Sequence, residues 1–329
     1  MTLERISTHT ANIGTLPVTP ESAHLLSLPS VSDGWRYAIA YWSGTIRNLL
    51  VSHHMRASKV EPCAAPVTIT PELRAQWQQL YGTEGAHVPV PYLYNQSVGT
   101  LLYTRIFRDL GINFRHLLHV QHQTVHYADV LDWVAVDRQE LHASLRGAWR
   151  LGDGKALIAT RIAIHRPRSD GGALVGTVND RFMIRNVPAA DLADLANGRA
   201  MMRSISALRR KDPALDVALP GTRIAEIPLP LDMGRRFGRV SGDSNPVHTT
   251  PFAAKLFGMK RPFLQGLGLR NAIVRQLAIA GIPLTRFQMS FTSPAYLGQT
   301  LRLVMQDREF EVVNETGHVV SFGSTTDQT

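Results

Sequence analysis

The chain has 329 residues, enough for about two domains, and its 44% hydrophobic and 19% charged residues are typical of a folded globular protein. Its net charge of +9 favours anionic partners, such as nucleic acid, a membrane surface, phosphate groups or an acidic protein. However, the sequence has no basic-aromatic nucleic-acid motif and no apolar run of about 18 residues that would span a membrane. The single cysteine, Cys63, excludes an internal disulfide and fits a reducing compartment. With no signal-peptide pattern after Met1, these features predict a cytoplasmic protein.

Residues 1–60 are predicted to be a lead segment with little pattern of its own. Within it, apolar residues recur from Trp35 to Val51, so this part is expected to pack on another element.

The rest of the chain contains a diverged internal repeat. Residues 69–82 align without gaps with residues 229–242, which places Trp77 on Phe237 and Gly82 on Gly242. A short strand-like run precedes each copy, at 67–69 and 224–227. An amphipathic helix follows each, at 98–106 before Gly111 and at 269–280 before Gly281. Glycine just past the last periodic residue is the expected helix stop.

Strand-like runs follow the helix in both copies, at 114–127, 131–136, 140–149, 156–164 and 173–185, and at 286–291, 300–306, 309–313 and 318–325. Asp137-Arg138 is predicted to correspond to Asp307-Arg308, and Gly154 to Gly317. One helix followed by several antiparallel strands is an α+β pattern. The predicted divisions are a lead segment (1–60), an N-terminal copy (61–187), a linker (188–221) with a helix at about 189–210, and a C-terminal copy (222–329).

The densest group of proton-handling side chains lies at residues 241–248, Ser-Gly-Asp-Ser-Asn-Pro-Val-His. On a helix, Asp243 and His248 would point about 140° apart. Pro246 argues against that helix, and Gly242 supplies backbone freedom before the acid. A tight turn would let both side chains converge as an acid–base pair on one water. The alternatives are that this is only a turn signal, or that Gly242-Asp243-Ser244 is the nucleophile block of a GDSL-type esterase with Glu315 and His318 as partners.

The longer stretch from Phe237 to Gly258 resembles the signature of MaoC-like enoyl hydratases and dehydratases, the R-specific branch of the hotdog fold. The matching residues are Phe237, Ser241, Gly242, Asp243, Asn245, Pro246, Val247, His248, Ala253 and Gly258. Two positions depart from the pattern. Thr250 stands where an acid or serine is usual, and Gln265-Gly266 stands where His-Gly is common. The second departure keeps the glycine but puts activity or specificity in doubt.

The resemblance, which covers about residues 60–325, implies a double hotdog in which two antiparallel sheets each wrap a long central helix. After Gly82, residues 83–88 lack the Asp and the Asn-Pro, and their histidine is one position out of register. We therefore expect one active site per chain, in the C-terminal copy, with the degenerate N-terminal copy shaping an acyl pocket.

The implied activity is reversible hydration of a trans-2-enoyl thioester to an R-3-hydroxyacyl thioester, with coenzyme A or acyl carrier protein as the carrier. By resemblance, Asp243 and His248 hold the catalytic water and Gly266 supplies the N–H that stabilises the thioester oxygen. Asn245 would orient the pair, and Ser241 would shape the turn. No metal or redox cofactor is implied. The rival from another class is a non-catalytic acyl-thioester-binding subunit, and a homodimer of double hotdogs stays open.

A second histidine group lies at positions 116, 119, 122 and 126. The repeat places it on a strand, where alternation would put His116, His122 and His126 on one side and His119 on the other. No nearby cysteine or acid completes a ligand set with these histidines, so metal binding is not expected.

Overall fold

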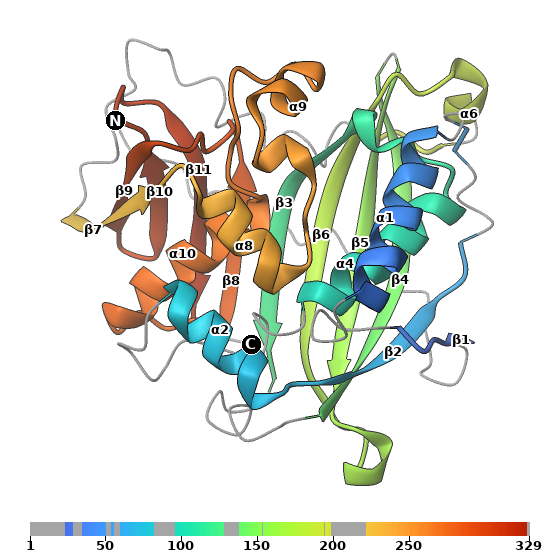
Figure 1. The fold of residues 1–329 in the computed structure, drawn as a ribbon, viewed down its shortest axis with the longest axis horizontal. Coiled ribbons are helices and arrows are strands. Elements are labelled where there is room, and N and C mark those ends of the chain that lie inside the picture. Colours follow the sequence, from blue (N-terminus) through green and yellow to red (C-terminus); the bar gives the residue numbers. More distant parts are fainter. Residues whose placement is uncertain are drawn as a thin grey trace.

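The computed structural model describes residues 24–28, 35–50, 54–55, 60–81, 96–127, 138–152, 154–193, 195–198 and 222–327. Within these residues, eleven strands form one curved sheet, and helices pack against it in both halves of the molecule (Figure 1). The predicted strand at 131–136 and the glycine predicted at the end of the first repeat, Gly82, lie outside the described residues.

The N-terminal half begins with β1 (His24–Leu25) and α1 (Trp35–Leu50). It continues with β2 (Cys63–Thr68), α2 (Pro71–Tyr81), α4 (Gln96–Asp109), β3 (Leu117–His126), β4 (Arg138–Gly152), β5 (Lys155–His165), β6 (Leu174–Arg185) and α6 (Ala189–Ala193). The C-terminal half contains β7 (Thr222–Leu229), α8 (Met233–Ser241), α9 (Pro251–Leu256), α10 (Gly266–Ile279), β8 (Arg286–Phe291), β9 (Gln299–Gln306), β10 (Glu309–Val313) and β11 (Val319–Thr326).

The two halves have the same strand order. The sheet runs β1-β2-β4-β5-β6-β3-β8-β11-β10-β9-β7, so β2-β4-β5-β6-β3 in one half mirrors β7-β9-β10-β11-β8 in the other. β3 pairs antiparallel with β8, and this pairing joins the two half-sheets edge to edge. The α+β double hotdog is therefore confirmed, with the two expected sheets fused into one.

The observed order corrects two details of the repeat. The β4–β5 hairpin, in which Gly152 pairs with Lys155, corresponds to the β9–β10 hairpin at Asp307-Arg308, because β4 pairs with β2 and β9 pairs with β7, the first strands of the two repeat copies. The predicted matches of Arg138 with Arg308, and of Gly154 with Gly317, are therefore one strand out of step, and Asp137 lies outside the described residues. The predicted 189–210 helix is also shorter, since α6 ends at Ala193 and Asn197 forms a bridge with Arg150; residues 199–221 lie outside the described part.

Residues that the repeat makes equivalent meet where the halves join. Trp77 on α2 and Phe237 on α8 contact edge to face, with ring centroids 5.8 Å apart, and both are 1% exposed. Two related helices that contact through related residues are expected near a pseudo-twofold axis. Gly111 and Gly281 follow the central helices α4 and α10 with φ of 75° and 71°, as predicted for helix stops.

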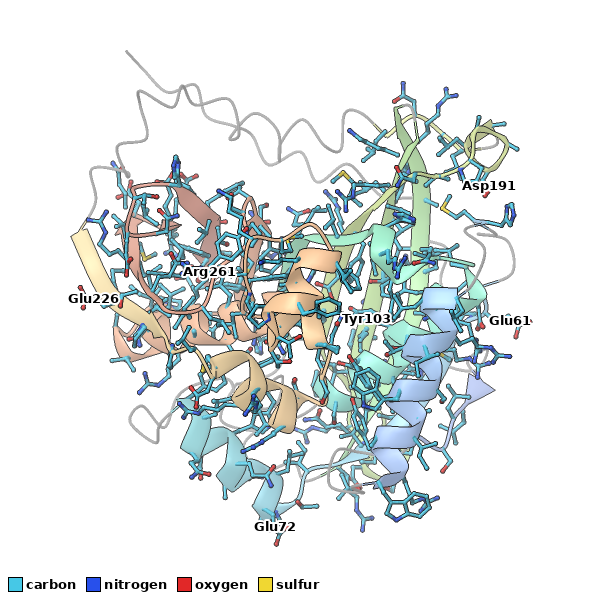
Figure 2. All side chains as sticks on the ribbon, turned by 45° about the horizontal axis from the view of Figure 1, so that its top comes forward. Glu61, Glu72, Tyr103, Asp191, Glu226 and Arg261 are labelled. Carbon is cyan, nitrogen blue, oxygen red and sulfur yellow. The ribbon has the colours of Figure 1, made fainter. Side chains whose placement is uncertain are left out.

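The lead segment contributes α1, which packs along the outer side of α4 (Figure 1). The Asn48 amide, fully buried, donates to the Thr104 carbonyl at 3.0 Å and fixes α1 on α4. Figure 2 shows Glu61, Glu72 and Glu226 at the periphery, whereas Tyr103 of α4 lies between the two halves. Among the described helices, none is long and apolar enough to cross a membrane.

Candidate active site

The turn that carries the candidate pair begins where α8 ends. Gly242 has φ of 76°, a left-handed conformation that glycine adopts without strain, and its N–H donates to the Gly238 carbonyl at 2.9 Å. The Ser241 hydroxyl accepts from the Asp243 N–H at 3.2 Å. Asn245 Oδ1 accepts from the Val247 N–H at 3.2 Å and caps a single 3₁₀ turn, Pro246–His248. The predicted turn is confirmed, and local hydrogen bonds occupy Ser241 and Asn245.

This turn brings Asp243 and His248 together. His248 Nε2 lies 3.9 Å from Asp243 Oδ2, and the side chains are 11% and 29% exposed. His248 Nδ1 lies 2.9 Å from the Phe263 carbonyl oxygen, which can only accept, so Nδ1 carries the hydrogen. Burial lowers the pKa of His248, outweighing the opposite effects of the Asp243 charge and the Phe263 carbonyl. The ring is therefore neutral at pH 7, with the lone pair of Nε2 facing Asp243.

Two glycines of α8 allow the turn to lie directly on the helix. A Cβ at Gly234 would stand 2.1 Å from the His248 carbonyl oxygen, and one at Gly238 would stand 2.8 Å from that of Asp243. These positions are four residues apart, so they lie on one face of α8. The glycines thus set the depth at which the Asp243–His248 turn sits, a role the sequence alone did not indicate.

Gln265 fastens the same turn from the other side. It is 2% exposed, and its Nε2 donates to the carbonyls of Gly234 and Asp243, each at 3.1 Å. The residue that departs from the resembled pattern therefore holds the backbone of the candidate acid. Its contacts are those of a positioning residue.

Gly266 is the first residue of α10, directly after Gln265. The first N–H groups of a helix have no partner within the helix, so this turn offers donors to a developing negative charge. A Cβ at Gly266 would lie 3.2 Å from the Phe291 ring and 3.3 Å from His119 Nδ1. The site at this helix end is therefore built from both halves of the molecule.

Tyr41 is a residue of the site that the sequence did not reveal. Its hydroxyl donates to Asp243 Oδ1 at 2.9 Å, across 202 residues of sequence, and the side chain is nearly fully buried. Burial and then the Asp243 charge raise the pKa of Tyr41, so the phenol stays protonated and acts as a donor. Tyr37 stacks on Tyr41 with ring centroids 6.2 Å apart and donates to the Ser97 carbonyl at 3.2 Å. The apolar pattern at 35–51 predicted packing, but no sequence signal pairs Tyr41 with Asp243.

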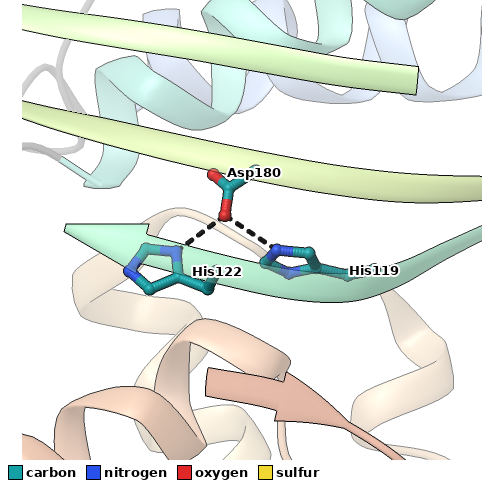
Figure 3. Close-up of side chains that lie close together, drawn as sticks. All are labelled: His119, His122 and Asp180. Carbon is teal, nitrogen blue, oxygen red and sulfur yellow. Dashed lines mark hydrogen bonds and ion pairs between the residues drawn. The ribbon is translucent and has the colours of Figure 1, made fainter. Parts of the chain in front are cut away.

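The histidines of β3 differ from the prediction. The β3–β6 register shifts between His119 and Gln121, so Val120 is an extra residue that breaks the alternation of sides. As a result, His119 Nε2 and His122 Nδ1 both contact Asp180 Oδ1, at 2.8 and 2.7 Å (Figure 3). His119 and His122 therefore share a side, and the acid comes from β6. His116 instead lies in a 3₁₀ turn before β3.

The geometry of this cluster favours hydrogen bonding over a metal site. The ligand atoms of His119, His122 and Asp180 lie within 4.8 Å of one another. Zinc–nitrogen and zinc–oxygen bonds of about 2.0–2.1 Å would hold tetrahedral ligands about 3.3 Å apart, farther than the 2.7 and 2.8 Å found here. Tyr103 also donates to the second oxygen of Asp180. Burial alone raises the pKa of Asp180, but His122 and His119 outweigh it and hold the pKa below its usual range. That no metal is used stays a prediction.

The geometry does not favour the esterase alternative. Ser244 is exposed after α8. Glu315 and His318 are exposed in the β10–β11 turn, where Glu315 accepts from the Thr300 N–H at 2.8 Å. The histidine nearest the Gly-Asp-Ser block is His248, and its Nε2 faces Asp243.

Comparison with known proteins finds a family match in the C-terminal half. Residues 220–328 match the family model of the MaoC like domain. Over 73 residues the chain is 33% identical to 3-hydroxyacyl-thioester dehydratase X of Mycobacterium tuberculosis, a match that covers 22% of this chain and 26% of that protein. The chain thus matches about a quarter of that relative's length.

Solved structures match over most of the chain. HtdX of Mycobacterium tuberculosis superposes with a TM-score of 0.56 at 17% identity, covering 80% of this chain and 98% of its own. A MaoC-like dehydratase from Phytophthora capsici gives 0.57 at 16% identity, covering 83% and 100%. At these identities the likeness establishes the fold, which extends over both halves.

Proposed function

We propose that this chain, whose residues 220–328 are a MaoC like domain, is a hydro-lyase that interconverts trans-2-enoyl and R-3-hydroxyacyl thioesters. The observation that carries the proposal is the pairing of Asp243 with a neutral, oriented His248 on one short turn. The relative with 33% identity is named as a 3-hydroxyacyl-thioester dehydratase, which supports the same reaction class.

In the proposed hydration, the Asp243 carboxylate and the His248 Nε2 lone pair hold one water through its two hydrogens. As the water oxygen adds to C3, one member of the pair accepts a proton and the pair returns a proton to C2. The protonation states at the end therefore equal those at the start, and dehydration is the reverse path. Tyr41 and Gln265 hold the Asp243 side chain and backbone in place during the transfer.

The thioester oxygen gains negative charge as C2 becomes enolate-like. In this proposal the N–H of Gly266, at the start of α10, donates to that oxygen. Asn245 and Ser241 keep the turn in shape through the hydrogen bonds described above. The carrier would be coenzyme A or acyl carrier protein, both anionic partners that suit a chain of net charge +9. We place this chemistry in the cytoplasm.

The test is steady-state hydration of crotonyl-CoA and of longer enoyl-CoA thioesters. Asp243→Asn and His248→Gln should each lower kcat/KM by at least about a hundredfold, because each removes one acid–base group. Unchanged activity in both variants would refute the mechanism. A wild-type protein that binds acyl thioesters on either carrier without hydrating them would favour the non-catalytic subunit. Cleavage of p-nitrophenyl esters that is lost in Ser244→Ala would favour the esterase.

A further inference from the structure

A small cavity of about 40 Å³ lies where the two halves join. Gly99, Thr100 and Tyr103 of α4 form one side, and Leu267 and Arg270 of α10 form another. Strands β3 to β6 close it with side chains that include His122, Thr124, Ile162 and Val178. Leucine, isoleucine and valine side chains share this lining with a few polar groups, which include Asp180 and Arg270. An apolar lining with a few polar groups is the composition typical of a ligand-binding cavity.

Two buried polar atoms in this lining have no hydrogen-bond partner within the described residues. They are His122 Nε2 and Thr124 Oγ1. The two residues are 2% and 1% exposed. A buried polar atom left unsatisfied costs stability, so natural proteins rarely keep one without a ligand or an ordered water. Because His122 and Thr124 are two apart on β3, with no bulge between them, both side chains face the same way.

The hydrogen-bond pattern shows which chemistry these atoms need. Asp180 accepts at His122 Nδ1, so that nitrogen carries the hydrogen. Burial lowers the pKa of His122 despite the Asp180 charge, so the ring is neutral and Nε2 is a lone-pair acceptor. The Thr124 hydroxyl can donate. A hydroxyl group complements both atoms, since it donates to Nε2 and accepts from Thr124.

The position of the cavity connects it with the proposed active site. Leu267 directly follows Gly266, and Arg270 lies one helical turn, about 6 Å, along α10. An acyl chain whose thioester oxygen lies at Gly266 would meet this cavity a few carbons farther on. The volume is more than the roughly 10–15 Å³ that a cavity needs to hold one water, so it accepts one small polar group.

We propose that this cavity is a subsite for a hydroxyl group on the acyl chain, so that the preferred substrates are hydroxylated enoyl thioesters. This inference rests on the proposed function, because it assigns the substrate class of the same site. The competing occupant is a single buried water, which would satisfy the same two atoms and confer no preference.

The experiment compares enoyl-CoA substrates of about six to ten carbons, matched in length and ending in either a methyl or a hydroxyl group. These lengths bracket the distance of about 6 Å along α10 from Gly266 to Arg270. At the length that reaches the cavity, wild-type kcat/KM should be about tenfold higher for the hydroxylated substrate, since two hydrogen bonds are gained. In His122→Asn, the side-chain amide can donate to Asp180 in place of Nδ1, but nothing replaces the Nε2 acceptor. This variant should therefore lose most of the preference. Thr124→Val keeps the side-chain shape but removes the hydroxyl, so the tenfold preference should fall to about threefold.

Ser321→Ala is the matched control, because Ser321 is a fully buried hydroxyl on β11 that donates to Ser290 and lines no part of this cavity. It should keep the wild-type preference. Equal rates on both substrates at every length would overturn the subsite and leave the hydratase proposal intact. If no substrate is hydrated, calorimetric binding of the matched saturated acyl-CoAs decides. The hydroxylated one should bind about tenfold tighter to the wild type, and equal affinities would overturn the inference.

Discussion

The strongest test of the site is Tyr41→Phe, which removes one hydroxyl and keeps the ring that stacks on Tyr37. The lost hydrogen bond, 2.9 Å to Asp243 Oδ1, joins a neutral donor to a carboxylate. Such bonds contribute about 1.5–3 kcal/mol. Because the Asp243 side chain is 29% exposed, water replaces part of that contribution, which leaves about 1–1.5 kcal/mol. If Tyr41 orients the carboxylate for proton transfer, kcat should fall about five- to tenfold.

The assay is hydration of a short enoyl-CoA, with kcat and KM measured separately and thermal unfolding followed in parallel. Tyr37→Phe is the matched control, since the Tyr37 hydroxyl donates to the Ser97 carbonyl and not to Asp243. It should cost stability but change kcat less than about twofold. A Tyr41→Phe variant with wild-type kcat, or a Tyr37→Phe variant with an equal loss of kcat, would refute the assignment of Tyr41 as a positioning residue.

Three further changes test other supports of the site. Gln265→Glu, nearly isosteric, removes both donors to the carbonyls of Gly234 and Asp243, so the free energy of unfolding should fall by about 2 kcal/mol or more, measured by urea denaturation. Gly234→Ala places a methyl 2.1 Å from the His248 carbonyl, so kcat should fall at least about tenfold as the turn is displaced, measured with crotonyl-CoA. Burial, and then the Arg270 charge, lower the pKa of His126 to about 3 in the folded state, whereas an unperturbed histidine has a pKa of about 6.5. Below pH 6.5 the unfolded chain therefore binds a proton on His126 that the folded chain does not bind. The unfolding free energy should therefore fall by about 2 kcal/mol between pH 6.5 and pH 5, and His126→Gln should lessen that fall.

Each of these three predictions has an outcome that would contradict it. Unchanged stability in Gln265→Glu would show that the amide is not needed to hold the two carbonyls. Full activity in Gly234→Ala would show that the turn tolerates displacement from α8. For the pH series, His318→Gln changes an exposed histidine and should leave the acid slope as in the wild type, so an equal effect of both variants would contradict the role of burial at His126.

The sequence was sufficient for the candidate pair because that part of the site is local. Asp243 and His248 are five residues apart, and Gly242 and Pro246 restrict the backbone between them to a turn. The repeat was also predictable, since glycine after each central helix and the pairing of Trp77 with Phe237 reflect the same packing in both halves. Strand order, by contrast, depends on pairings between distant segments, so the predicted matches at Arg138 and Gly154 were one strand out of step.

Two parts of the site could not be predicted, for separate physical reasons. Tyr41 reaches Asp243 only because α1 packs on α4, through contacts such as that of Asn48 with Thr104. No local pattern specifies a contact across 202 residues. The His119–His122 pairing depends on a bulge at Val120, and the strict alternation of side chains along a strand fails at one extra residue.

The two halves share one strand order, but their acid–histidine groups lie at different places in it. In the C-terminal half, the acid and histidine lie on a turn after α8, where side chains remain partly open to solvent. In the N-terminal half, the acid and histidines lie within β3 and β6, where Asp180 has no exposed side-chain surface. A solvent-accessible pair can exchange protons with water, whereas a fully buried carboxylate with three donors has its hydrogen bonds occupied. The acid of the proposed acid–base pair therefore stays partly open to water, whereas Asp180 is enclosed by the sheet, and this difference follows from where each acid lies in the fold.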